Sequence, residues 1–178
     1  AQASRLNRLQ TLAFGILNYE SANGSFPPGP NSPALKGKPV GLSWRVLILP
    51  YISQSNLYRK FALDEPWDSP TNIALLSEMP DVYSQFGARL LGPADAQPGL
   101  TTLVAPISEG TILGFPGRAG FGGIRDGSSN TILLVNVKDE LAVPWTRPQG
   151  YVFDRDDPAA GLRFDDGKTL VTMADGSA

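Results

Sequence analysis

The sequence predicts an α+β fold in which an N-terminal helix packs on a small antiparallel sheet, with additional short helices and long loops. Three observations predict it. Apolar residues recur every three to four positions over residues 3–20, as on a helix with one buried face. Further helical segments end near residue 80, and segments rich in β-branched residues follow from about residue 83. This order is typical of an α+β fold, and 178 residues suffice for a single domain over 1–178.

The first helix is predicted over residues 3–20. "NGSFPP" ends it, because Gly24 suits a left-handed cap and the two prolines that follow cannot continue a helix. The apolar stripe of this helix includes four aliphatic residues: Leu6, Leu9, Leu12 and Ile16. The stripe either faces the sheet or continues into a contact with other subunits, and the pattern alone leaves both open.

A loop rich in proline and glycine is predicted over 27–41. The apolar segment 42–52 follows, and Pro50 divides it into a short buried strand or helical piece and a turn. Residues 53–62 are predicted to form a short helix, with Ser53 as its N-cap.

The next helix is predicted over residues 69–79, directly after the acidic stretch "LDEPWDSPTN". Ser69 is its N-cap, and Pro70 occupies the first helical position, where the missing N–H costs nothing. Pro80 ends it.

The second half of the chain is predicted to form strands. The segments 101–107, 110–115 and 130–137 are rich in β-branched residues. In residues 162–173, Asp166-Gly167 stands between two strand-like runs, which is a strong signal for a β-hairpin.

Composition excludes several kinds of chemistry. The net charge is −2 with the charges mixed along the chain, so the basic stripe of a nucleic-acid-binding protein and a polybasic membrane patch are both missing. Without cysteine or histidine, the chain has no disulfide, no thiolate or imidazole metal site and no Ser-His triad. The longest apolar run, 46–52, is too short to cross a bilayer. The glycine-rich segment 114–127 lacks the spacing of a phosphate-binding loop, and no cofactor is expected.

Acidic clusters give weak candidates for a metal or a hydrolytic site. Calcium prefers hard oxygen ligands in loops, which makes "DRDD" a weak calcium candidate through Asp154, Asp156 and Asp157. A hydrolase would need two carboxylates about 5–10 Å apart in a cleft, and its candidates are Asp68, Asp154, Asp156 and Asp165. The simpler interpretation is that these acids are solvated turn residues.

Two tryptophans beside polar side chains suggest a binding surface for a glycan or another envelope ligand. An exposed indole beside Asp or Arg can stack on a sugar, whereas burial in the core between helix and sheet is the simpler interpretation of both rings. The candidates are Trp44, Arg45, Trp67, Asp68 and, from the "RDGSSN" loop, Asp126, Ser129 and Asn130. Asp64 and Glu65 complete the set, because no structural role is evident for them.

Five phrases in a fixed order carry a family resemblance. They are "FGILNYESANGSFPP", "LSWRVLILPYISQSNLY", "LDEPWDSPTN", "RDGSSNTILLV" and a terminal "ADGS". Together, over residues 4–177, they resemble the DUF1559 family, a large planctomycete group of pilin-like proteins with prepilin-type leaders. The family's C-terminal signature has a histidine, nine residues and then Asp-Gly. Here Asp175-Gly176 matches, but Asp165 stands in the histidine's place.

The resemblance implies a pseudopilin-like fold and a non-enzymatic role in the cell envelope or outside the cell. Residues 3–20 are similar to the second half of the family's long N-terminal helix. The hydrophobic first half, which anchors or assembles the protein, is missing from this sequence. The resemblance therefore predicts other protein subunits as partners and a membrane contact only through that missing segment. An envelope binding module is the alternative, and a carboxylate-based hydrolase is a more remote one.

Overall fold

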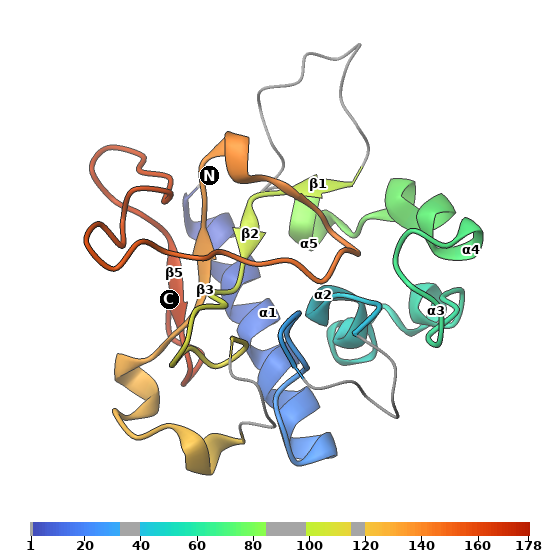
Figure 1. The fold of residues 1–178 in the computed structure, drawn as a ribbon, viewed down its shortest axis with the longest axis horizontal. Helices are drawn as coiled ribbons and strands as arrows, with labels where there is room; N and C mark the ends of the chain where they lie inside the picture. The colour runs from blue at the N-terminus through green and yellow to red at the C-terminus, as the bar shows by residue number, and fades with distance from the viewer. Residues whose placement is uncertain (1, 33–39, 85–98, 115–119) are drawn as a thin grey trace.

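The computed structural model describes residues 2–32, 40–84, 99–114 and 120–178. Its α-helices are α1 (Gln2–Asn23), α2 (Trp44–Leu47), α3 (Ser55–Tyr58), α4 (Pro70–Ile73) and α5 (Asp81–Ser84). Its 3-10 helices are η1 (Leu49–Ile52), η2 (Ala74–Glu78), η3 (Phe121–Gly123), η4 (Ser128–Asn130) and η5 (Asp139–Leu141). Its strands are β1 (Leu100–Thr101), β2 (Leu103–Val104), β3 (Ile132–Asn136), β4 (Val143–Pro144) and β5 (Val171–Met173). In Figure 1, α1 runs behind the strands, and α2, α3 and α4 lie on the side away from β5. This confirms the predicted α+β fold.

The long helix α1 confirms the first predicted element and extends it at both ends. Gly24 adopts φ 71°, and its N–H donates to the carbonyl oxygen of Glu20 over 2.7 Å, as in a left-handed helix cap. Leu9, Leu12 and Ile16 are fully buried in the main core. The apolar stripe therefore faces the domain's own sheet and neighbouring helices.

The segment after the proline-rich loop is helical and not a strand. Ser43 caps α2, because its side-chain oxygen accepts a hydrogen bond from the N–H of Arg45. Pro50 lies in the first turn of η1, where its missing N–H costs nothing. The predicted role of Ser53 is wrong. Ser53 adopts the left-handed conformation that ends η1, and Gln54 precedes α3 without a side-chain cap.

The helix predicted over 69–79 is present as α4 followed directly by η2. Ser69 caps α4 as predicted, since its hydroxyl oxygen accepts from the N–H of Asn72 over 3.3 Å. Pro70 lies in the first helical turn. The chain leaves the helical conformation at Met79 and resumes it in α5 after Pro80.

The main sheet has the order β2-β3-β5, with both pairings antiparallel, and β1 and β4 form a separate two-stranded ladder. Strand β3 is central, which agrees with the β-branched run predicted at 130–137. Four of its five residues are buried, including Asn136, because the strand is covered on both faces.

Two strand predictions need correction. The segment 101–107 is interrupted, so that β1 and β2 join different ladders. The described part of 110–115 forms turns. There the Thr111 hydroxyl lies 2.7 Å from the Ser108 carbonyl oxygen, and the same side-chain oxygen accepts from the N–H of Gly114. A hydroxyl that bonds to nearby backbone competes with strand pairing. Residue 115 lies outside the described residues.

The predicted hairpin at 162–173 is present only at its turn. Asp166 and Gly167 have φ values of 51° and 73°, as a two-residue hairpin turn requires, and the flanking Asp165 and Lys168 exchange two backbone hydrogen bonds. Beyond this bridge the two arms separate. Leu162 pairs with Val137, whereas β5 pairs with β3.

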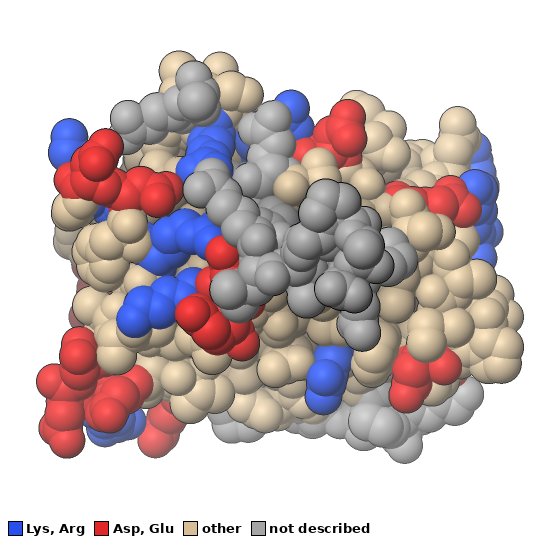
Figure 2. Space-filling view, turned by 90° about the horizontal axis from the view of Figure 1, so that it is seen from above, with Lys and Arg blue, Asp and Glu red and all other residues tan. Residues whose placement is uncertain are grey.

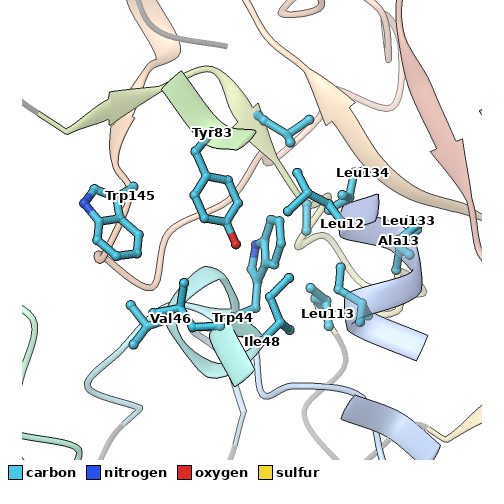
Figure 3. Packing of buried hydrophobic residues seen from close by; sticks show 14 of the residues in the cluster. Leu12, Ala13, Trp44, Val46, Ile48, Tyr83, Leu113, Leu133, Leu134 and Trp145 are labelled. Carbon is cyan, nitrogen blue, oxygen red and sulfur yellow. The ribbon is translucent and has the colours of Figure 1, made fainter. Parts of the chain in front are cut away.

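The core contains a group of aromatic rings between the short helices and the strands. The ring of Tyr83 stacks on Trp145 with centroids 5.9 Å apart and meets Trp44 edge-on at 6.3 Å. Figure 3 shows the Trp44 indole rising from α2 towards Tyr83 and Leu12. In the described part of the chain, no helix has the length and apolar character needed to cross a membrane.

Candidate functional site

The stretch "LDEPWDSPTN" folds around its last residue, Asn72, which is fully buried. The Asn72 side-chain oxygen accepts from the N–H of Ala62 over 2.9 Å. Its amide nitrogen lies 3.0 Å from the carbonyl oxygens of Ala62 and Pro66 and 3.3 Å from that of Glu65. One amide side chain thus replaces the backbone partners that the loop lacks. The sequence analysis did not predict this role of Asn72. The only available signal was its place as a polar residue in the first turn of a helix capped by Ser69.

The three acidic side chains of this stretch, unlike Asn72, make no hydrogen bond to the loop backbone among the described residues. Asp64 and Asp68 are exposed and Glu65 is half-buried, and none of their carboxylates contacts a basic side chain among the described residues. Trp67 is half-buried against the core, and the Arg147 guanidinium lies over its ring at 5.5 Å from the centroid. The Arg147 side chain therefore already covers one face of the Trp67 indole.

Trp44 and Arg45 lie in the core, so they are unavailable to a ligand in solvent. Trp44 is buried against Tyr83, and Arg45 has an exposed fraction of 0%. The Arg45 Nε and Nη2 groups donate to the carbonyl oxygen of Leu103 over 3.0 and 2.7 Å, and Nη1 donates to the Ser43 hydroxyl over 3.0 Å. The proposed roles of Trp44 and Arg45 in ligand binding are therefore wrong.

The Arg45 guanidinium is buried without a carboxylate partner among the described residues. Burial lowers the pKa of Arg45 to about 10, and the nearby Tyr83 hydroxyl partly opposes that shift. Its charge is also placed over the Trp44 ring, with the guanidinium carbon 4.9 Å from the ring centroid. Arg45 thus acts as a hydrogen-bond donor that joins α2 to β2.

The "RDGSSN" loop is separate from the tryptophans. Asp126, Ser129 and Asn130 are exposed, and the Asn130 amide donates to the carbonyl oxygen of Asp126 over 3.0 Å within the loop. In Figure 1 this loop lies at the lower left, whereas the segment before α4 lies at the right. The structure therefore does not gather the predicted binding residues on one surface.

The acidic clusters do not form a metal site in the described residues. Asp154, Asp156 and Asp157 are exposed, and the Asp154 carboxylate accepts from the N–H of Asp156 over 2.9 Å. No group of three or more Asp and Glu side chains in the described ranges is arranged to hold a metal ion. Asp68 is exposed just before α4, and the Asp165 carboxylate pairs with Arg5 at 3.2 Å.

A polar cavity lies where the first turns of α1 meet the C-terminal third of the chain. Its volume is about 570 Å³. Its lining combines basic, acidic, amide and aliphatic side chains, including Arg5, Leu6, Asn136, Arg163, Asp165, Asp166, Lys168 and Thr169. Among these residues, the predictions singled out Leu6 for assembly, Asp165 for a hydrolytic site and Asp166 for a hairpin turn. Arg163 and Lys168 flank the turn at Asp166-Gly167. Backbone hydrogen bonds from the Arg163 N–H to the Asn136 carbonyl oxygen and from the Asn136 N–H to the Leu170 carbonyl oxygen bring this segment beside Asn136.

The described residues form a small α+β domain with a polar cavity. The chain belongs to the family described as "Protein of unknown function (DUF1559)", labelled SBP_bac_10, which matches residues 2–102. No curated protein and no solved structure matches the chain.

Proposed function

We propose that this chain is a non-enzymatic, pilin-like structural protein that assembles with copies of itself in the cell envelope. Membership of the family supports the proposal together with one observation on α1. This helix uses one stripe for its own core and presents another to solvent.

The exposed stripe of α1 is the proposed contact between subunits. It consists of Asn7, Thr11, Phe14 and Asn18, which follow one another at helical spacing. Phe14 has an exposed fraction of 53%, large for an aromatic side chain on a helix that is otherwise well packed. Leu9, Leu12 and Ile16 cannot make this contact, because they are fully buried within the domain.

Disulfide trapping tests the contact cleanly, since the chain contains no cysteine. Thr11→Cys places a thiol on the exposed stripe, and Thr71→Cys places one on exposed residues of α4 as a matched control. We expect Thr11→Cys to form a covalent dimer under mild oxidation in proportion to protein concentration, and Thr71→Cys to remain monomeric. Equal and low yields from both variants would contradict the proposal.

A second pair of variants separates assembly from folding. Phe14→Ser is expected to weaken self-association in sedimentation experiments while leaving the free energy of unfolding almost unchanged. Ile73→Ser removes an apolar side chain of similar exposure, 45%, from α4 and should leave association unchanged. A wild-type chain that stays monomeric at all concentrations would exclude self-assembly through α1.

A further inference from the structure

The cavity beside the first turns of α1 has the size of a small-molecule site. Its volume of about 570 Å³ falls within the range of roughly 300–1,000 Å³ that is common for such sites. Leu6, Leu170 and Val171 contribute apolar surface, and the remaining lining is mostly polar or charged. Such a mixture fits a small polar solute.

One polar group in the lining is buried and lacks a partner among the described residues, the Thr169 hydroxyl oxygen. Asn136, exposed by only 2%, accepts from the Thr102 hydroxyl over 2.7 Å through its side-chain oxygen. A buried polar group without a hydrogen bond costs about 1–3 kcal/mol. The Thr169 hydroxyl therefore favours a ligand or water in the cavity.

The basic side chains of the lining have hydrogen-bond donors to spare. The Arg163 side chain, exposed by 13%, pairs with Asp139, and Arg5 pairs with Asp165. Each pairing uses one N–H group of a guanidinium that carries five. Lys168 makes no ion pair with any described residue. Arg5, Arg163 and Lys168 therefore keep N–H groups beyond those used in ion pairs among the described residues.

Figure 2 shows several basic side chains close to acidic ones on its left half, the side on which the C-terminal loops lie in Figure 1. Arginine and lysine recognise carboxylate and phosphate groups through short, charge-assisted hydrogen bonds.

We propose that this cavity binds a small organic solute that carries a carboxylate or phosphate group. The oxyanion is held by Arg5, Arg163 and Lys168, and the Asn136 amide donates to it from the buried wall. Asp166, at the rim, accepts from a hydroxyl or amine of the solute. This site is independent of the proposed assembly through the exposed stripe of α1.

Calorimetric titration of the chain with matched probes tests the site. The oxyanion probes are glucuronate, succinate and inorganic phosphate, and the uncharged counterparts are glucose and succinamide. We expect at least one oxyanion to bind and its uncharged counterpart to fail. Binding of phosphate alone identifies a phosphoryl group as the recognised chemistry, and binding of glucuronate or succinate identifies a carboxylate.

Two variants connect binding to the cavity. Lys168→Gln removes an exposed, unpaired cation and is expected to weaken binding about tenfold or more, as loss of a charge-assisted hydrogen bond predicts. Arg155→Gln removes the same charge from an exposed side chain outside the lining and should leave binding unchanged. The proposal is overturned if no oxyanion binds, if glucose binds as well as glucuronate, or if both variants weaken binding equally.

Discussion

The Tyr83 hydroxyl donates a hydrogen bond of 3.0 Å to the main-chain carbonyl oxygen of Arg45, and both residues are completely buried. The contact joins α5 to α2 across the aromatic core. The Arg45 side chain in turn donates to the carbonyl oxygen of Leu103 in β2. Arg45 thus connects α2, α5 and β2, which are far apart in the sequence. The acceptors are its own carbonyl oxygen and that of Leu103.

Removal of the Tyr83 hydroxyl is expected to destabilise the fold. Tyr83→Phe keeps the ring contacts with Trp44 and Trp145 but leaves the carbonyl oxygen of Arg45 without this donor. We expect a loss of about 1–2 kcal/mol in the free energy of unfolding, measured by urea denaturation. Tyr58→Phe is the control, since that half-buried hydroxyl makes no hydrogen bond to a described residue. Equal effects of the two substitutions would contradict this role of Tyr83.

Alkaline pH is expected to remove the advantage of wild type over Tyr83→Phe. Burial raises the pKa of Tyr83 above its ordinary value of about 10. Above that pH the unfolded chain loses the phenolic proton while the folded chain keeps it, so this contribution to stability falls as pH rises. Arg45, with its pKa lowered to about 10, acts in the opposite direction, but it is present in both proteins. Urea denaturation from about pH 8 to 11 measures the difference, and a difference independent of pH would contradict the prediction.

Substitutions of Arg45 are expected to separate the effects of charge and hydrogen bonding. Arg45→Lys keeps a buried charge but cannot reproduce the paired donors to the Leu103 carbonyl, so we expect a loss of about 2–4 kcal/mol. Arg45→Met removes the charge as well as the donors, and it should destabilise less than Arg45→Lys. Thermal and urea unfolding measure the order. A lysine variant as stable as wild type would show that the guanidinium geometry is unimportant.

Loss of the Asn72 side chain is expected to unfold the acidic loop before α4. Asn72→Ala leaves the N–H of Ala62 and several carbonyl oxygens without their side-chain partner, at an expected cost of about 2–4 kcal/mol. Thr71→Ala changes the exposed neighbouring residue and should alter stability by less than about 0.5 kcal/mol. Comparable losses in the two variants would show that the helix, and not the amide, stabilises the loop.

The parts of the fold that follow from local rules were predictable. Apolar spacing predicted α1, the serine–proline pair predicted the start of α4, and the β-branched run predicted β3. The failures come from longer-range or competing interactions. Ser53 has the chemistry of a helix cap, but η1 requires a left-handed residue there. The second arm of the predicted hairpin joins β3, because that pairing completes the sheet.

The candidate sites were harder to predict, because burial and proximity are tertiary properties. Arginine is usually exposed, and Arg45 is buried only because an acceptor 58 residues away meets its guanidinium. The cavity residues Asn136, Arg163 and Lys168 are ordinary polar residues in the sequence, and Asn136 meets the other two only after residues 163–173 pair beside β3. Asp64 and Glu65, singled out for their chemistry, belong to a loop that Asn72 organises through its backbone.

The contact of α1 with β5 joins the first helix of the chain to its last strand. A ribosome makes α1 before β5, so the packed face of α1 lacks this strand until β5 has been synthesised. Folding of this domain is therefore complete only once β5 has been made, and the nascent chain must be kept from aggregating during that interval. Strand β5 thus decides when a much earlier helix becomes protected.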